Sequence, residues 1–331
     1  MPGPSRAQMQ KVTSMATLLW LQTGACSGDT MSILNAEEPN LLETLHNYGV
    51  ELLFHPSLSS QTPKQLLQVI NEICRDEREL TVLAVEGSIA FGPDGTGMYD
   101  SLQGRPKKDI VAALADKAMF VVAMGTCACF GGVVAAEPNP TDATGLQYLR
   151  SEKGALLGPD YVSRGGLPVV NVAGCPAHPR TMVETIITLL LTNTIELDAI
   201  NRPATYFDRV VHQGCVRNEY HEYSIEEAGF GGQGCLYFNL GCQGPYTQGR
   251  CNTDLWNGVN SKPRAGSPCY GCTAPTFPRD QDLMQTQKIG NIPVRMPVGV
   301  DRARYMAYKG LAKAAGPERL VQLRLKAKCA G

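Results

Sequence analysis

The sequence predicts an α/β domain built around a mainly parallel sheet, followed by an irregular region rich in cysteine. Short apolar runs alternate with segments of helical periodicity over the first half of the chain, as in a protein whose buried strands are joined by helices. From about Asn201 this periodicity fades, and seven of the 12 cysteines follow, between Cys215 and Cys329. We therefore expect two domains, over residues 1–197 and 198–331.

The first domain should contain five buried strands, each a short run rich in Val, Leu and Ile: Thr17–Leu21, Val50–Phe54, Thr81–Val85, Phe120–Met124 and Pro168–Val172. Helical patterns occupy Met31–Tyr48, Pro63–Arg75, Pro106–Lys117 and Arg180–Leu191. Strands that alternate with helices form βαβ units with right-handed crossovers. In such sheets ligands bind beyond the carboxyl ends of the strands, so the residues that follow each strand are candidates for a site.

The composition excludes several classes of protein. The 30 basic and 31 acidic side chains nearly cancel, which argues against a nucleic-acid partner. No apolar run approaches the length of a membrane span, and the first residues, MPGPSRAQMQK, show neither an apolar export segment nor an arginine pair. We therefore expect a soluble protein of the cytoplasm. Its 12 cysteines should then be thiols, and clustered cytosolic thiols usually bind metal or catalyse.

Three of the predicted strands are followed by a cysteine. Cys26 follows the first strand, Cys127 the fourth and Cys175 the fifth, while Glu86 ends the third. Because the carboxyl ends of parallel strands lie at one edge of the sheet, these side chains should converge. Glycines flank them and would let the backbone approach a bulky group: Gly24, Gly28, Gly87, Gly125 and Gly174. A cubane iron-sulfur cluster needs ligands from several directions, and three cysteines supply three of its corners.

Asp29 stands three residues after Cys26, where a fourth ligand would complete the set. An Asp in this position could instead be the N-cap of the helix that begins near Thr30, because a short carboxylate accepts hydrogen bonds from the first N–H groups of a helix. With three thiolate candidates at the same edge, we favour the ligand interpretation.

The second domain carries seven candidate ligands in a segment with little apolar periodicity, and metal binding could supply its folding energy. HxxC and CxxC spacings both occur among them. The candidates are His212, Cys215, Cys235, Cys242, Cys251, Cys269 and Cys272. Tetrahedral zinc is the competing interpretation, but seven ligands do not divide into fours. Together with the four in the first domain they make 11, which divide into two sets of four and one of three, as two four-iron clusters and one three-iron cluster require. His221 is predicted to be a loop histidine.

Seven motifs in this order resemble the small, electron-transferring subunit of nickel-iron hydrogenases. They are LLWLQTGACSGDTMS, VEGSI, GTCACFGG, NVAGCPAHP, HQGC, GCLYFNLGCQGP with the cysteine that follows it, and AGSPCYGC, and they extend from residue 18 to about residue 275. The resemblance implies a flavodoxin-like, doubly wound parallel sheet that carries a proximal cluster. It also implies an irregular iron-sulfur domain that carries a medial and a distal cluster.

The resemblance also assigns the ligands. It makes Cys26, Cys127 and Cys175 proximal ligands, and Asp29 occupies the position where the family usually has a fourth cysteine. The distal 4Fe-4S cluster would be bound by His212, Cys215, Cys235 and Cys242, and the medial cluster by Cys251, Cys269 and Cys272. Relatives with a four-iron medial cluster have a further cysteine between the first two medial ligands. The stretch NTDLWNGVNSKPRAGSP contains none, so a 3Fe-4S cluster is expected there.

An aspartate ligand is typical of the cytoplasmic, actinobacterial-type members, which oxidise hydrogen in air. A carboxylate is a harder and less electron-donating ligand than a thiolate, so Asp29 should change the potential of the proximal cluster. We expect it to favour function in oxygen. Gly28 and Gly132 stand where oxygen-tolerant membrane-bound members carry two extra cysteines, so the special cluster of those members is not expected.

The resemblance implies that hydrogen is split at a nickel-iron centre in a separate large subunit and that this chain passes the electrons to an acceptor, which the sequence does not identify. A dimer of heterodimers or a larger assembly is expected. Glu86 could border a proton route or cap the next loop. A regulatory, hydrogen-sensing hydrogenase and a zinc-stabilised scaffold are the alternatives. A basic helical pattern over Ala303–Ala314 could be a solvated face or a docking surface.

Overall fold

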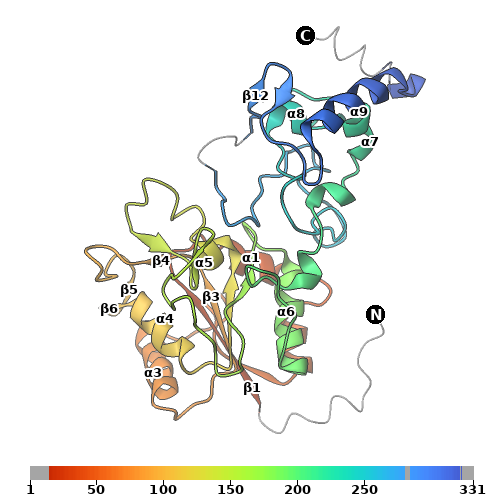
Figure 1. Ribbon diagram of the computed structural model, residues 1–331. Helices are drawn as coiled ribbons and strands as arrows, with labels where there is room; N and C mark the ends of the chain where they lie inside the picture. Colours follow the sequence, from red (N-terminus) through yellow and green to blue (C-terminus); the bar gives the residue numbers. More distant parts are fainter. Residues whose placement is uncertain (1–14, 280–283, 321, 323–331) are drawn as a thin grey trace. The chain divides into compact units, whose positions relative to one another are not determined.

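The computed structural model describes residues 15–279, 284–320 and 322 of the chain (Figure 1). The chain forms two compact units. The first comprises Met1–Thr205 and Pro275–Phe277, and the second comprises Tyr206–Ala274 and Pro278–Gly331. The domain boundary expected from the sequence, between residues 197 and 198, lies shortly before this division.

A five-stranded parallel sheet forms the centre of the first unit, in the order β11-β7-β3-β1-β2. Counted along the chain, the sheet strands lie in the order 2-1-3-4-5, which is the flavodoxin-like order. The predicted parallel α/β fold is therefore confirmed. The strands are β1 (Ala16–Gln22), β2 (Val50–Phe54), β3 (Val82–Glu86), β7 (Phe120–Met124) and β11 (Val170–Val172). Their register pairs Gln22 with Glu86, and Glu86 with Met124, so the carboxyl ends of three central strands are level.

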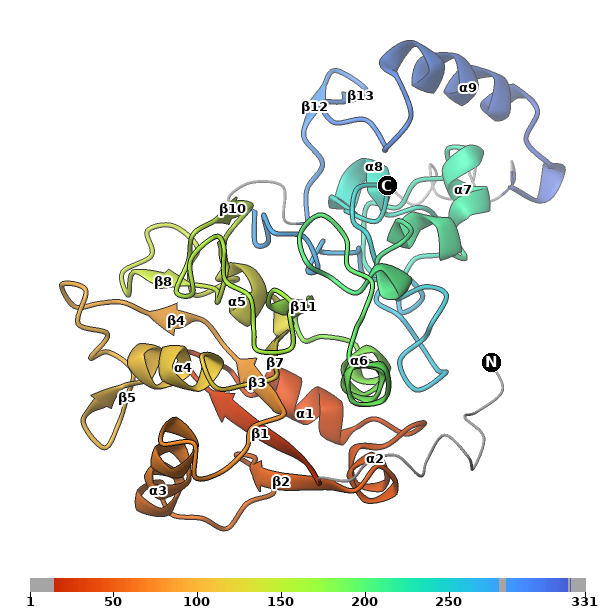
Figure 2. The same cartoon turned by 60° about the horizontal axis from the view of Figure 1, so that its bottom comes forward.

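Helices cover both faces of this sheet, as the two views show (Figures 1 and 2). On one face, α1 (Gly28–Leu34) and α2 (Leu41–Asn47) pack against α6 (Pro179–Thr192). On the other face, α3 (Pro63–Cys74) packs against α4 (Lys107–Ala115). The short helix α5 (Gly125–Phe130) directly continues β7. Small two-stranded ladders occupy the loops: β4 (Ile89–Ala90) with β8 (Ala143–Thr144), β5 (Ser101–Leu102) with β6 (Arg105–Pro106), and β9 (Tyr148–Leu149) with β10 (Glu152–Lys153).

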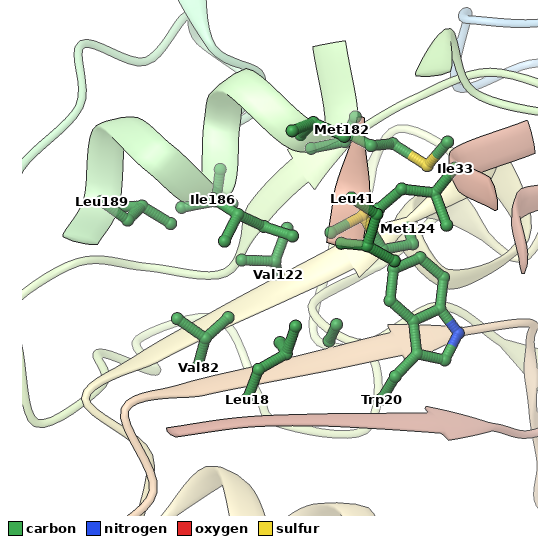
Figure 3. Close-up of a cluster of buried hydrophobic side chains, with 14 of the residues drawn as sticks. Leu18, Trp20, Ile33, Leu41, Val82, Val122, Met124, Met182, Ile186 and Leu189 are labelled. Carbon is green, nitrogen blue, oxygen red and sulfur yellow. The ribbon is translucent and has the colours of Figure 1, made fainter. Parts of the chain in front are cut away.

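The core beneath α1, α2 and α6 is built from alternate residues of the strands. Leu18 and Trp20 of β1 point into it with Val82 of β3 (Figure 3). Other buried members that the figure labels are Ile33, Leu41, Val122, Met124, Met182, Ile186 and Leu189. Each large apolar side chain buried here contributes about 1.5–3 kcal/mol relative to leaving it in water. This packing fixes the ends of the strands, from which the site residues project.

One predicted helix is wrong. The sequence predicts a single helix over Met31–Tyr48, but the chain forms α1, ends it at Leu34 and starts α2 at Leu41. Pro39 lies between them, and a proline has no N–H to continue a helical hydrogen-bond ladder. Asn40 then caps α2, because its side chain accepts a 2.8 Å hydrogen bond from the backbone N–H of Glu43.

The second unit has little regular structure. Its elements are short except for the last: η3 (Val211–Gly214), α7 (Asn218–Glu222), α8 (Tyr237–Leu240), β12 (Lys288–Ile289), β13 (Ile292–Pro293) and α9 (Arg302–Ala314). A further turn of helix, η2 (Ala204–Tyr206), lies where the chain passes from one unit to the other. Helix α9 confirms the helical pattern predicted for Ala303–Ala314, and Asp301 caps its first turn. None of the helices within the described residues is long and apolar enough to cross a membrane.

Candidate metal centres

Helix α5, which follows β7, and the loop that follows β11 are tied together beside two of the predicted ligands. The backbone N–H of Thr126, next to Cys127, donates a 2.8 Å hydrogen bond to the carbonyl of Gly174, next to Cys175. In return the hydroxyl of Thr126 accepts a 2.9 Å hydrogen bond from the backbone N–H of Gly174. The structure thus brings the segments that carry Cys127 and Cys175 together at the carboxyl edge of the sheet.

Cys26 and Asp29 lie near the same edge. Burial is the main cause that raises the pKa of Cys127, and its neighbours Asp29 and Cys26 add to the increase. The loop of Cys26 is joined to the end of β3 by a pair of backbone hydrogen bonds between Gly24 and Ser88, of 2.9 and 3.1 Å. Cys26 is exposed, whereas Cys127 and Cys175 are half-buried.

Asp29 does not act as the cap of its own helix. It is the second residue of α1, its side chain is buried, and its Oδ1 accepts a 2.6 Å hydrogen bond from the backbone N–H of Ala177. The carboxyl therefore reaches across to the loop that carries Cys175. Burial raises the pKa of Asp29 to about 7, and the nearby carboxylate of Glu86 adds to the increase. An anionic carboxylate at this position would be stabilised by a cation.

Two glycines leave room at the candidate proximal site, and a side chain at either position would crowd one of the predicted ligands. A Cβ on Gly125 would lie 2.0 Å from Asp29 Oδ2, and a Cβ on Gly132 would lie 2.6 Å from Cys127 Sγ. Both glycines have positive φ, of 80° and 55°. Three thiols and one carboxyl around such a cradle are a suitable donor set for an iron-sulfur cluster, so the residues present fit the group that the sequence predicts.

Glu86 is the cap of α1. Its Oε1 accepts a 3.0 Å hydrogen bond from the backbone N–H of Asp29, and its Oε2 accepts one of 3.2 Å from the backbone N–H of Thr30. Three side chains also donate to Oε2, at 2.5–3.1 Å: the Thr30 hydroxyl, the indole of Trp20 and the amide of Gln22. A carboxylate at a helix N-terminus satisfies N–H groups that lack a partner within the helix. The geometry thus supports the capping interpretation of Glu86, and its part in a proton route stays a prediction.

Two cysteines of the first unit, Cys74 and Cys129, are not among the predicted proximal ligands. The structure explains the position of Cys129. The side chain of Cys129 is fully buried, and its Sγ lies 3.5 Å from the carbonyl of Ala123, to which it donates a weak hydrogen bond. It therefore packs as a small hydrophobic residue. Cys74 ends α3, and Cys329 lies outside the described residues.

The predicted distal ligands lie close together in the second unit. His212 lies in the turn η3, which Cys215 follows directly, and the backbone N–H of Cys215 donates a 3.0 Å hydrogen bond to the carbonyl of His212. Gly244 lies between two of the ligands, since a Cβ on it would be 3.5 Å from Cys242 Sγ and 3.6 Å from the backbone nitrogen of His212. Burial is the main cause that raises the pKa of Cys235, and the neighbouring Cys242 and Cys215 contribute to the same increase.

The sequence predicts His221 to be a loop histidine, but the structure places it beside the predicted distal ligands. Its Nδ1 lies 3.4 Å from Cys235 Sγ, and its ring packs edge-on against that of His212 with 4.9 Å between centroids. Burial lowers the pKa of His221 to about 4, so the ring is neutral at pH 7. The sequence separation of 14 between His221 and Cys235 matches no ligand spacing, and no signal in the sequence could have placed the histidine here.

The predicted medial ligands also converge. Burial raises the pKa of Cys251 to about 11, and the neighbouring Cys272 adds to the increase. The pKa of Cys269 is raised by burial first, with smaller contributions from Cys242, Cys272 and Cys251. Gly271 makes the turn of the CxxC motif possible, because its φ of 76° favours glycine.

A hydrogen bond joins the two ligand sets of the second unit. The backbone N–H of Cys269 lies 3.3 Å from Cys242 Sγ, and the backbone N–H of Gln243 donates a 2.7 Å hydrogen bond to the carbonyl of Cys269. A predicted medial ligand therefore contacts a predicted distal ligand directly.

Over the described part of the chain, no three His, Cys, Asp or Glu side chains form a group that could hold a single metal ion.

Comparison with known proteins places the chain in a family. Residues 207–285 match the family described as the C-terminal part of the NiFe/NiFeSe hydrogenase small subunit, and residues 26–189 match the NADH ubiquinone oxidoreductase 20 Kd subunit family. The periplasmic NiFe hydrogenase small subunit 1 of Nitratidesulfovibrio vulgaris is 32% identical over 283 residues, which cover 83% of each protein. The chain belongs to the family of nickel-iron hydrogenase small subunits.

Two solved structures are similar over most of their length. The actinobacterial-type NiFe hydrogenase from Ralstonia eutropha is 30% identical, with a TM-score of 0.77 over 96% of each chain. The NiFeSe hydrogenase from Desulfomicrobium baculatum is 29% identical, with a TM-score of 0.70 over 82% of this chain and all of that one. As a member of this family, the chain is an electron-transferring subunit that binds iron-sulfur clusters and pairs with a large subunit. The predicted family is thus confirmed.

Proposed function

We propose that this chain relays electrons through three iron-sulfur clusters, from hydrogen oxidation in the large subunit to a separate acceptor. When bound, each cluster supplies a site that accepts and gives up one electron at a time. Cys26, Asp29, Cys127 and Cys175 would hold a proximal 4Fe-4S cluster. Three cysteines, Cys251, Cys269 and Cys272, would hold a medial 3Fe-4S cluster, and a distal 4Fe-4S cluster would be held by His212, Cys215, Cys235 and Cys242.

The contact between Cys269 and Cys242 is the observation that best supports the relay. An electron moves between two clusters only when they are close, and the 3.3 Å hydrogen bond from Cys269 N–H to Cys242 Sγ makes the last two ligand sets immediate neighbours.

The proposal assigns Asp29 the fourth corner of the proximal cluster. Its support is the position of the carboxyl: Oδ1 is held by the loop of Cys175, while Oδ2 lies against Gly125 in the loop of Cys127. Because a carboxylate donates less electron density than a thiolate, Asp29 would shift the proximal potential. We propose that this shift adapts the enzyme to oxygen. The cytoplasmic location and the dimer of heterodimers are also proposals, and they rest on the sequence.

Metal analysis of the purified native complex tests the relay. We expect 11 irons and 12 acid-labile sulfides in this chain's three clusters, in addition to the iron and nickel of the large subunit. The oxidised complex should show the EPR signal of a three-iron cluster. Zinc in place of iron, or fewer than three clusters, would refute the proposal. Rapid hydrogen oxidation would distinguish a respiratory enzyme from the slow regulatory, hydrogen-sensing type.

A further inference from the structure

His221 is a buried histidine that none of the predicted ligand sets includes, yet it touches two predicted ligands at once. Its Nδ1 is 3.4 Å from Cys235 Sγ, and its ring lies edge-on to the ring of His212. On a further side it packs against Tyr237, with 5.4 Å between ring centroids and an interplanar angle of 70°. Side chains on three sides therefore fix the plane of the imidazole.

The backbone also fixes His221 relative to Cys235. Helix α7 carries the histidine, whose N–H donates a 3.0 Å hydrogen bond to the carbonyl of Arg217. After the helix the chain turns back to Cys235. The N–H of Cys235 donates a 2.8 Å hydrogen bond to the carbonyl of Ile225, and its carbonyl accepts one of 2.9 Å from the N–H of Glu227. These backbone hydrogen bonds close the loop between His221 and Cys235, and they thereby fix the distance between His221 Nδ1 and Cys235 Sγ.

Helix α9 secures this loop from the other side. Lys309 forms a 2.9 Å ion pair with Glu226, and its ammonium lies 3.8 Å from the centroid of the Phe238 ring. Arg319 is paired with Glu219 of α7. Exposed ion pairs contribute little stability individually, but here they hold the segment on both sides of His221.

The direction of the hydrogen bond follows from the chemistry of the sulfur. A cysteine that binds iron is a thiolate and can only accept, so the imidazole must donate from Nδ1–H. Tyr237 N–H is a second donor to the same sulfur, at 3.4 Å. Hydrogen bonds to a cluster's sulfurs withdraw electron density and favour the reduced state, which raises the reduction potential.

We infer that His221 is a positioning residue of the distal cluster that donates a hydrogen bond from Nδ1 to Cys235 Sγ, and so raises the potential at which the last cluster accepts an electron. The inference rests on the proposed relay, since it needs a cluster bound to Cys235. It gives the second histidine of this region a role distinct from that of His212, which binds iron.

Variants of His221 in the native heterodimeric complex test this inference. Asparagine places its side-chain nitrogen close to where Nδ1 lies, whereas phenylalanine fills the space of the ring without a donor. We expect His221→Phe to keep the full iron content and to lower the midpoint potential of the distal cluster in an EPR-monitored titration. The expected shift is about tenfold in the ratio of reduced to oxidised cluster, or roughly 59 mV for a one-electron couple. His221→Asn should restore most of that shift.

A control separates this role from ligation and from general damage. His46→Phe, at an exposed position on α2, should leave the distal potential unchanged. Pulsed EPR should still detect the nitrogen of a ligating histidine in His221→Phe. Loss of that coupling or of one iron would show that His221 is the ligand, and an unchanged potential in His221→Phe would show that it only packs. Either result overturns the inference, whereas the absence of clusters from the unsubstituted complex would instead refute the proposed function.

Discussion

The Oδ1 atom of Asp29 lies 2.6 Å from the backbone nitrogen of Ala177, which follows Cys175 and Pro176. This hydrogen bond joins a residue of the first helix to the loop after the fifth strand of the sheet. An Asp that served only as an N-cap would instead bind the N–H groups of its own helix, and Glu86 already occupies that position. The carboxyl of Asp29 is therefore directed toward the predicted proximal ligands.

The first prediction concerns the nature of this ligand. Asp29→Cys should keep four irons at the proximal site and lower its midpoint potential by roughly 59 mV or more, because a thiolate donates more electron density to iron. Asp29→Asn can still accept from Ala177 N–H but offers iron only a neutral oxygen, so it should lose iron from this site alone. Redox titration followed by EPR measures both effects. If Asp29→Cys changed neither the potential nor the response to oxygen, Asp29 would not be a ligand that tunes the cluster.

Cys127 and Cys129 provide a matched pair in one short helix. Cys127→Ser should abolish the proximal cluster, because the thiolate is lost from the centre of the ligand set. Cys129→Ala should keep it and cost about 1 kcal/mol of packing, since this sulfur is buried and donates its weak hydrogen bond to the carbonyl of Ala123. Iron content and the visible absorption band measure the outcome. Equal iron loss in both variants would contradict the assignment.

Glu86→Gln tests whether the carboxylate caps α1 or carries protons. If Glu86 is a cap, glutamine should be a poor substitute. The amide N–H groups of the glutamine would face N–H and O–H donors that now bind the carboxylate, which should lower the free energy of unfolding by about 1–3 kcal/mol. We expect a lower thermal midpoint, by roughly 2–4 °C per kcal/mol, and weaker retention of the proximal cluster. A variant of unchanged stability whose hydrogen oxidation had a shifted pH profile would instead favour the proton route.

Removal of iron should affect the two units differently. The first unit has a packed sheet and should keep its fold, whereas the second has short helices and depends on its ligands for folding energy. After anaerobic treatment with a chelator, limited proteolysis should cut first within Tyr206–Ala274. Restoring iron and sulfide should restore protection. Equal resistance of the two units without iron would show that the second has an adequate core of its own.

The sequence was most informative where a local pattern determines the structure. The five strands appear where short apolar runs predict them, because a strand buried on both faces, such as β3, β7 or β11, needs such a run. The strand β2 at the edge of the sheet is less buried than the sequence predicts. The pattern failed at Pro39, where apolar periodicity continued through a residue that ends helical hydrogen bonding. Two features of the candidate site could be predicted from the sequence: the spacings of the ligands and the convergence of the strand ends.

Other features depend on contacts between distant residues and could not be predicted. His221 meets Cys235 only because the loop between them closes. Glu86 could be suspected from its place at the end of a strand. Its use as the cap of α1, however, depends on how β3 and β1 align, since Gln22 and Glu86 are paired in the sheet.

The cap that Glu86 provides has a further consequence for the proximal site. The buried carboxylate of Glu86, at the end of β3, anchors the first turn of α1 to the edge of the sheet. The backbone that carries Cys26 and Asp29 can therefore shift only if the hydrogen bonds to this carboxylate break. Electron transfer is fastest when the surroundings of a redox centre rearrange little as its charge changes. If this segment binds the proximal cluster as proposed, holding it in this way would keep the reorganisation energy small at the step where electrons would enter the chain.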